Sequence, residues 1–182
     1  GSGSPAEAAG YGPPGSAARR LTANGENMEK YILRKAAIAD VKSIHRLLMD
    51  CAGKRLLLPR SFNELYSHLR DFVVAEEPET GRVAGCCALT ITWEELAEVR
   101  SLVVAEDIQG LGLGRKLVEF CVSDALTFGI YKVFALTYQV RFFRKLGFSE
   151  VSKDVLPQKV WADCLKCPQF PECDEVAMMI EL

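Results

Sequence analysis

The sequence predicts an α/β protein in which helices flank a central, mixed β-sheet. Two observations indicate this class: the early strands follow one another through tight turns, and the later strands alternate with helices. Strands joined by tight turns pair antiparallel, whereas strands separated by a helix can run parallel. A single sheet with both kinds of connection is therefore a mixed sheet.

The first half of the expected fold contains a strand, two helices and three further strands. YILRKA at 31–36 has the alternation of a short strand, and Asp40 can cap a helix that Gly53 ends. Ser61 and Glu64 match a capping box, which predicts a second short helix. DFVVAEE and RVAGCCALTIT then predict a hairpin with PETG as its turn, and ELAEVRSLVV predicts the next strand.

The second half alternates helices with strands. GRKLVEFCVSDALTFG predicts a helix that Gly129 ends, YKVFALT a strand, and QVRFFRKLG a short helix that Gly147 ends. DEVAMMIEL predicts the final strand. The expected order is strand, two helices, three strands, helix, strand, helix and strand.

Residues 1–27 are expected to form a disordered tail outside the fold. They are rich in Gly, Ser, Ala and Pro, so burial cannot offset the entropy lost on ordering them. The opening Gly-Ser-Gly-Ser is typical of an expression vector, and Met28 is the expected natural start. Residues 28–182 then form one domain, which is long enough for a sizeable core.

Composition argues against several classes of protein. The formal net charge of −2 argues against a broad nucleic-acid surface. The sequence has no apolar run of about 18 residues and no signal peptide, so a soluble, cytoplasmic protein without a membrane segment is expected. The seven cysteines are odd in number, and Cys86 and Cys87 are adjacent in an apolar strand. Free buried thiols are therefore expected rather than a disulfide framework.

A glycine-rich loop lies between the strand that ends near Val104 and the next helix. Gly110, Gly112 and Gly114 alternate in it, and a basic, amphipathic helix follows at once. Glycines let successive backbone N–H groups converge, and the helix N-terminus adds partial positive charge, so the loop suits a phosphate group. The loop lacks the Lys-Ser/Thr of a Walker A motif and the spacing of a dinucleotide-binding loop. A tight corner between strand and helix is the structural alternative.

The loop matches Gln-x-x-Gly-x-Gly and resembles the acetyl-CoA pyrophosphate loop of the GNAT superfamily of N-acetyltransferases. RSLVVAED is similar to the central strand of that superfamily, FFRKLGF to its downstream motif, and the order of elements to its fold. The resemblance implies the acyl-CoA N-acyltransferase fold, with acetyl-CoA as cosubstrate and no metal. It implies coenzyme contacts by Leu102, Val103, Val104, Gln109, Gly110, Leu111, Gly112, Leu113, Gly114, Arg115 and Phe143.

One position departs from the superfamily pattern. The superfamily often uses a tyrosine as general acid in the downstream motif, and the matching residue here is Phe143, which has no proton to donate. The proton for the departing coenzyme A thiolate must therefore come from elsewhere.

Three further segments, LLLPRS, AEVRSLVV and VFALTY, resemble the acetyltransferase domain of N-acetylglutamate synthase, and DVLPQK supports the match. By that resemblance Glu98 is the general base, Thr137 the general acid and Arg60 a clamp for a substrate carboxylate. Tyr138 is a rival acid. The residue types suit these roles, because a carboxylate can accept a proton from an ammonium and arginine binds carboxylates through two parallel hydrogen bonds.

Each assignment has a structural alternative. Glu98 can be an ordinary carboxylate on the face of a sheet, Thr137 a common strand residue and Arg60 a solvated loop charge. Lys54 and Lys159 are candidates for the second carboxylate of a dicarboxylic substrate.

The leading hypothesis is an acetyl-CoA:L-glutamate N-acetyltransferase that begins arginine biosynthesis. One alternative is a GNAT enzyme for another small amine or amino acid, and another is an acetyl-CoA-binding module without turnover. Arg60 favours a carboxylate substrate over a polycation, and Glu98 with Thr137 favours turnover. A homodimer is expected only by analogy with the superfamily.

A cysteine-containing segment near the C-terminus stands where a basic segment is expected from the family. It supplies three closely spaced thiols, one fewer than a tetrahedral zinc site requires, and neither histidine is near in sequence. Buried or partly exposed thiols are therefore favoured over zinc at Cys164, Cys167 and Cys173.

Overall fold

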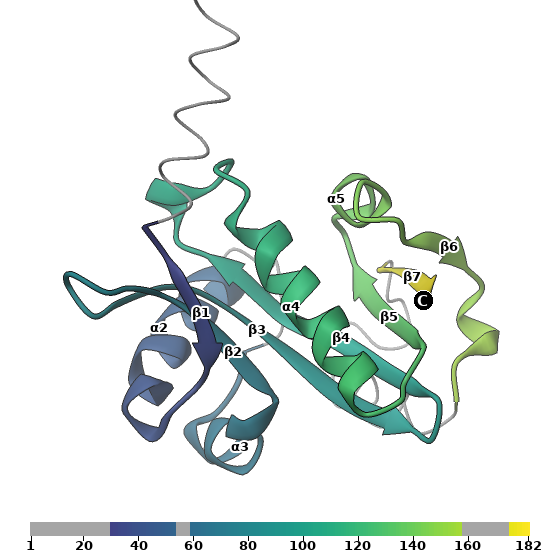
Figure 1. Ribbon diagram of the computed structural model, residues 1–182, viewed down its shortest axis with the longest axis horizontal. Coiled ribbons are helices and arrows are strands. Elements are labelled where there is room, and N and C mark those ends of the chain that lie inside the picture. Colours follow the sequence, from purple (N-terminus) through teal and green to yellow (C-terminus); the bar gives the residue numbers. More distant parts are fainter. Residues whose placement is uncertain (1–29, 54–58, 158–174) are drawn as a thin grey trace, which may run out of the picture.

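A computed structural model describes residues 30–53, 59–157 and 175–182 (Figure 1). Its seven-stranded sheet has the order β1-β2-β3-β4-β5-β7-β6. The strands are β1 Ile32–Lys35, β2 Phe72–Glu77, β3 Arg82–Trp93, β4 Leu96–Val104, β5 Lys132–Thr137, β6 Ser149–Val151 and β7 Val176–Glu181. The α-helices are α2 Val41–Gly53, α3 Phe62–Ser67, α4 Leu113–Thr127 and α5 Val140–Arg144.

The sheet is mixed, which confirms the expected class. Strands β1 to β4 pair antiparallel in chain order, β4 and β5 pair parallel, and β7 pairs antiparallel with β5 and β6. The expected order of elements is confirmed except for β6, which was not expected. Three residues are too few to show the alternation by which a strand is recognised in a sequence.

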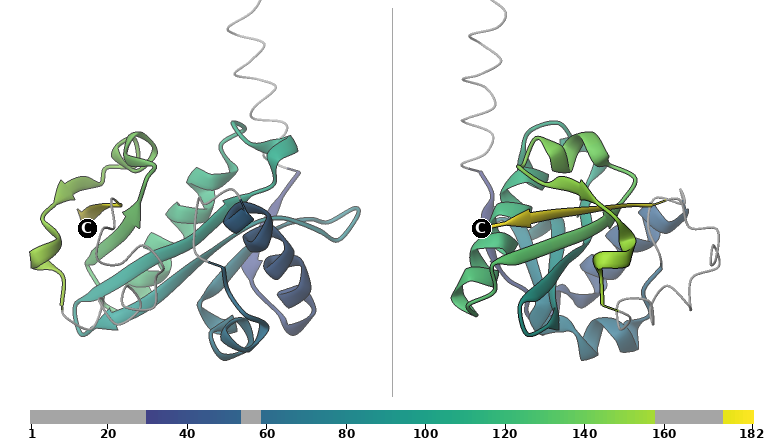
Figure 2. Two further views of the ribbon diagram at one scale, coloured as in Figure 1. Left: turned by 180° about the vertical axis from the view of Figure 1, so that it is seen from behind. Right: turned by 90° about the vertical axis from the view of Figure 1, so that its right-hand side faces the viewer.

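Helices cover both faces of the sheet (Figures 1 and 2). One face packs against α4 through a core that includes Val73, Val99, Leu117 and Phe148. The other face packs against α2 and α3 through a second core, in which Ile44, Leu48 and Leu65 meet side chains of β2 and β3. Two helix layers therefore hold the sheet from opposite sides.

The α4 helix ends as its sequence predicts. Gly129 has a φ of +73°, and its N–H donates to Leu126 O at 3.0 Å, while Ile130 N donates to Ala125 O at 3.0 Å. These two bonds form a Schellman motif, which satisfies carbonyl groups that the helix itself leaves unpaired. The motif turns the chain directly into β5.

Asp40 does not cap α2 in the way that the sequence suggested. Its carboxylate accepts the Ala37 N–H at 2.7 Å and thereby closes a short 3₁₀ turn, Ile38–Asp40, that precedes the helix. Arg34 donates to the same carboxylate through two nitrogens, at 2.7 and 2.9 Å. A buried carboxylate requires such partners, so Asp40 joins β1 to the start of α2.

The expectation of free, buried thiols is confirmed for the cysteines of the sheet and of α4. Cys86, Cys87 and Cys121 are buried and unbridged. Burial raises the pKa of Cys86 and Cys87, which keeps these thiols protonated. In the part of the chain that the structure describes, no helix is both long and apolar enough to span a membrane.

Candidate active site

The coenzyme loop, residues 109–115, has the geometry that its glycines predict. Gly110 and Gly112 have φ values of +81° and +90°, a region that residues with a Cβ rarely adopt. The Gln109 side chain donates to Val104 O at 2.9 Å and so fastens the loop to the end of β4. The loop therefore passes from strand to helix in a defined conformation.

Backbone donors gather at the start of α4. Lys116 N donates to Gly112 O at 3.3 Å, which is the first bond of the helix. The N–H groups of Leu113, Gly114 and Arg115 precede that bond, so they have no acceptor within the helix. Together with the positive end of the helix dipole they make a site for an anionic group.

The ring of Phe142 packs beside this loop. A Cβ added to Gly114 would lie 3.6 Å from Phe142 Cζ and 3.6 Å from Val104 Cγ2. The ring thus connects α5 to the coenzyme loop, a role that the sequence motif did not indicate. Its neighbour Phe143 is only 4% exposed and stacks edge to face on Phe142 and Phe148. A direct contact between Phe143 and the coenzyme stays a prediction.

The side chain of Arg115 lies along the helix. Its Nε donates to Glu119 Oε1 at 2.7 Å, and both side chains are more than half exposed. An exposed ion pair of this kind contributes little free energy, so an incoming phosphate can compete with Glu119 for the guanidinium.

Strands β4 and β5 diverge beyond a short paired segment (Figure 1). Their parallel pairing covers only Leu96–Glu98 of β4, opposite Lys132, Val133 and Phe134. From Val99 to Val104, β4 pairs with β3 alone. The backbone N–H and C=O groups along its other edge therefore have no partner among the strands that the structure describes. An extended chain that carries amide groups can pair with such an edge, as strand-like ligands do. Leu102, Val103 and Val104 of the sequence prediction lie on this segment.

A β-bulge interrupts β4 next to this edge. Cys86 pairs with Val103 and Ala88 with Arg100, so β4 has one residue more than β3 in this interval. Ser101 occupies the bulge with a φ of +54°, the only positive φ of a non-glycine residue in the described chain. Bulges re-aim side chains and are frequent beside active sites.

Glu98 is the last residue of β4 that pairs with β5. Its neighbours Ala97 and Val99 belong to the core under α4, so Glu98 faces the other side of the sheet, toward α3. Its side chain is 13% exposed, and its Oε2 lies 3.6 Å from Nη1 of Arg100. The sequence did not point to Arg100 as a site residue, although strand alternation places Arg100 on the same face as Glu98.

Arg100 and Arg60 line the same cavity, of about 230 Å³, between α3 and strands β3 and β4. Arg60 precedes the capping box of α3, and its side chain is 18% exposed. Ser101 and Thr90 also line this cavity, which is called the acceptor cavity below. The structure thus brings the predicted clamp together with a second arginine, Arg100, and this second arginine contacts the predicted base.

The acidic groups of the acceptor cavity have partners of their own. Glu64 accepts the Ser61 N–H at 2.8 Å and lies 3.7 Å from Arg60. Asp71 accepts the Thr90 hydroxyl at 3.0 Å, and one of its oxygens lies 3.5 Å from His68 Nδ1. These contacts reduce the repulsion that an anionic ligand would otherwise meet.

Thr137 and Tyr138 differ in burial at the end of β5. Thr137 is 8% exposed, and its Oγ1 accepts the Gln139 N–H at 2.9 Å, which fixes the hydroxyl at the start of α5. Tyr138 is 38% exposed. Thr137 follows the alternation of Val133 and Ala135, which face α4, so Glu98 and Thr137 approach the divergence of β4 and β5 from opposite faces of the sheet.

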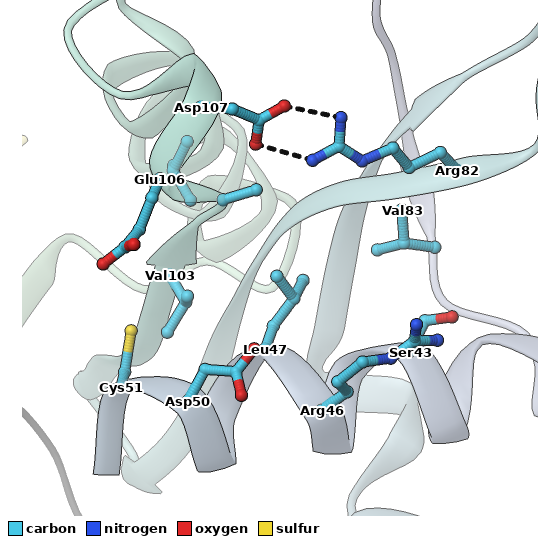
Figure 3. A pocket seen from close by; sticks show the side chains of 12 residues that line it. Ser43, Arg46, Leu47, Asp50, Cys51, Arg82, Val83, Val103, Glu106 and Asp107 are labelled. Atoms are coloured by element: carbon cyan, nitrogen blue, oxygen red, sulfur yellow. Dashed lines mark hydrogen bonds and ion pairs between the residues drawn. The ribbon is translucent and has the colours of Figure 1, made fainter. Parts of the chain in front are cut away.

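A larger cavity, of about 670 Å³, lies between α2 and the end of β4 (Figure 3). Arg82 and Asp107 border it and form a double hydrogen bond with N···O distances of 2.6 and 2.7 Å. That bond lowers the pKa of Asp107 and ties the start of β3 to the turn before the coenzyme loop. Arg46 and Arg82 line this cavity, whereas Arg100, the arginine that contacts the predicted base, lines the smaller one, so the smaller cavity fits the acceptor better.

Some predicted residues lie outside the described chain. Lys54, Lys159 and the three cysteines Cys164, Cys167 and Cys173 belong to this group, and their predicted roles stay untested. Within the described ranges no group of three or more His, Cys, Asp or Glu side chains could hold a metal ion.

Comparison with known proteins adds to this geometry. The family model described as the acetyltransferase (GNAT) family matches residues 41–148. An uncharacterized N-acetyltransferase of Chlorobaculum tepidum is 41% identical over 147 residues, which are 81% of this chain and 94% of that protein. An amino-acid acetyltransferase of Mycobacterium tuberculosis is 36% identical over 121 residues, which are 66% of this chain and 69% of that protein.

A solved structure resembles most of this chain. It is N-acetylglutamate synthase from Neisseria gonorrhoeae, complexed with coenzyme A and N-acetyl-glutamate, and it matches with a TM-score of 0.76 at 27% identity. The match covers 84% of this chain and 35% of that longer chain.

Proposed function

The chain belongs to the acetyltransferase (GNAT) family, and on that premise we propose that it transfers the acetyl group of acetyl-CoA to the α-amino group of L-glutamate. The product is N-acetyl-L-glutamate, as in the first step of arginine biosynthesis. One observation carries the choice of substrate: Glu98 contacts Arg100, which lines a cavity together with Arg60. A base next to two carboxylate-binding groups suits a dicarboxylic amino acid.

Acetyl-CoA is the proposed donor. The N–H groups at the start of α4 receive its pyrophosphate, and the unpaired edge of β4 receives the amide groups of its pantetheine. The N-acetylglutamate synthase that resembles this fold was crystallised with coenzyme A, which supports this placement.

The proposed reaction is a direct transfer. Glu98, directly or through a water molecule, takes a proton from the glutamate ammonium, and the free amine attacks the thioester carbonyl. A C–N bond forms, the C–S bond breaks, and the coenzyme A thiolate leaves with the electron pair of that bond. Thr137 donates a proton to the thiolate, and the second proton that the attacking nitrogen loses as the amide forms returns to Thr137 through water. A thioester that passes between β4 and β5 would meet the base on one face of the sheet and the acid on the other.

The size of the acceptor cavity agrees with a small substrate. Its volume of about 230 Å³ is below the range of roughly 300–1,000 Å³ typical of pockets for drug-sized ligands. The names of the relatives also support a small amino-acid substrate, since one is an amino-acid acetyltransferase and another an N-acetylglutamate synthase.

The test replaces the base by its neutral isostere. Glu98→Gln keeps the shape of the side chain and removes the proton acceptor, so kcat for L-glutamate should fall by roughly 100-fold or more while acetyl-CoA binding is retained. Raising the pH should partly restore kcat, because more of the amine is then unprotonated. Thiol release from acetyl-CoA, measured from pH 6 to pH 10, provides both readouts.

Glu95→Gln is the matched control. Glu95 carries the same group on the β3–β4 turn, where its side chain is 74% exposed and lies 3.6 Å from Lys132. This variant should keep the parent activity. Parent-like turnover of Glu98→Gln across the pH range would show that Glu98 is not the base. A parent enzyme that prefers another amine over L-glutamate would show that the proposed substrate is wrong.

A further inference from the structure

We propose that the two arginines of the acceptor cavity divide the substrate between them, with Arg100 binding the α-carboxylate and Arg60 the side-chain carboxylate. This inference rests on the proposed function and extends it to the selection of the substrate. Arg100 and Arg60 stand on different walls of the cavity, on β4 and before α3 respectively.

Arg100 owes its position to the bulge in β4. In a regular strand the next residue would face the opposite side of the sheet, yet both Arg100 and Ser101 line the acceptor cavity. The left-handed conformation of Ser101, with a φ of +54°, accounts for this departure from alternation. The bulge therefore supplies two adjacent polar side chains to one wall.

The contact between Arg100 and Glu98 assigns the α-carboxylate. The amine that loses a proton to Glu98 is bonded to the carbon that also carries the α-carboxylate. A guanidinium whose Nη1 lies 3.6 Å from the Glu98 carboxylate is therefore the arginine that the α-carboxylate meets first. On substrate binding, the α-carboxylate takes over donors of Arg100, and Glu98 turns to the ammonium.

Arg60 faces the remaining carboxylate. Its guanidinium lies 3.7 Å from Glu64, a carboxylate that Ser61 already engages through its N–H and its hydroxyl. Because Glu64 is committed to the capping box, the fork of Arg60 can accept a second anion. The side-chain carboxylate of glutamate extends away from the amine and so reaches this wall of the cavity.

The experiment compares three amines that differ by one carboxylate each. L-glutamine keeps the α-carboxylate and replaces the side-chain carboxylate with a neutral amide. 4-Aminobutyrate keeps an amine and the distant carboxylate but lacks the α-carboxylate. The value of kcat/KM for each amine is measured with the parent and with Arg100→Met, Arg100→Lys and Arg60→Met.

We expect each Met variant to lose its preference for L-glutamate over one of the two analogues and to keep its preference over the other. In Arg100→Met the preference for L-glutamate over 4-aminobutyrate should fall by at least about 30-fold, because a two-point contact to the α-carboxylate is missing. The preference for L-glutamate over L-glutamine should stay near the parent value. Arg60→Met should show the reverse pattern, and Arg100→Lys should restore part of the lost preference.

A purely structural role makes a different prediction. It lowers all three rates together and leaves both ratios unchanged, and ratios measured within one preparation are insensitive to a partly unfolded sample. Arg46→Met, in the larger cavity, is the matched control and should change neither ratio. Unchanged ratios in Arg100→Met, or both ratios falling in each variant, would overturn the division.

Failure of the proposed function would appear in a different place. It would show in the parent, as an absence of preference for L-glutamate over both analogues. Failure of the division of the carboxylates would show only in the variants of a parent that has that preference.

Discussion

The coenzyme loop and the acceptor cavity differ in how the chain builds them. The loop is one continuous segment, and its donors are backbone N–H groups at the start of α4. The acceptor cavity draws side chains from α3, β3 and β4, which lie between Arg60 and Ser101 in the sequence. The loop therefore depends on backbone conformation, whereas the cavity depends on the charge and placement of individual side chains.

This difference suits the loop to binding the shared coenzyme and the cavity to selecting the amine substrate. Backbone donors can bind the same phosphate whatever side chains surround them, so the loop suits a coenzyme that all acetyl transfers share. Side chains that converge from separate elements can be exchanged one at a time, so the cavity can be adjusted to a particular amine. Substitutions in the two regions should therefore affect the two substrates separately.

The largest effect is expected in the coenzyme loop. Gly112→Val places a β-branched residue at a φ of +90°, which it can occupy only with strain, so the loop should shift and the Kd for acetyl-CoA should rise by roughly 100-fold. Calorimetry on the folded variant measures that affinity. Gly53→Val, at the end of α2 and with open space around its position, is the control. An unchanged Kd in Gly112→Val would mean that the loop only turns the chain.

A smaller effect, on stability, is expected on the acceptor side of the sheet. The hydrogen bond from Arg34 lowers the pKa of Asp40 below its usual value, against the opposite effect of burial, and the Ala37 N–H lowers it further. Asp40→Asn should reduce the free energy of unfolding at pH 7 by about 2 kcal/mol, because a partly buried guanidinium loses one of its two carboxylate partners and keeps only Glu76. Urea unfolding measures the difference.

The sign of the pH dependence follows from the lowered pKa. A carboxyl group whose pKa is lower in the folded state stabilises the protein above its unfolded pKa of about 3.9, and this contribution is lost as the pH falls through the folded pKa. The difference between parent and Asp40→Asn should therefore be constant near neutral pH and shrink below about pH 4. A difference that grows in acid would contradict the assignment.

The smallest effect is expected where the two regions meet, at the end of β5. Thr137→Val removes the hydroxyl and keeps the shape, and a thiolate is a good leaving group, so kcat should fall by only about 10-fold, less than the roughly 100-fold typical of general acid catalysis, with little change in either KM. Tyr138→Phe should leave kcat unchanged, because Tyr138 is more exposed than Thr137. The reverse result in a paired measurement of thiol release would make Tyr138 the proton donor.

The sequence anticipated most of the fold, because periodicity and capping are local properties. The mixed sheet, the capping box at Ser61 and the helix end at Gly129 all follow from short stretches of residues. The strand β6 and the 3₁₀ turn at Asp40 were missed. A three-residue strand exists only through its pairing with β7, and the Asp40 carboxylate is directed by Arg34, which is on a neighbouring element.

Sequence alone determined the loop at 109–115, because its glycines and the helix that follows are contiguous and the binding proposed for them uses only their backbone. Tertiary structure alone decided that Arg100 and Arg60 share a cavity and that Glu98 lies 3.6 Å from Arg100. It also decided that the bulge at Ser101 turns two adjacent side chains to one wall, since a bulge is defined by the pairing of β4 with β3. The physical reason is that local conformation is encoded over a few residues, whereas a pocket of side chains forms only when distant elements pack together.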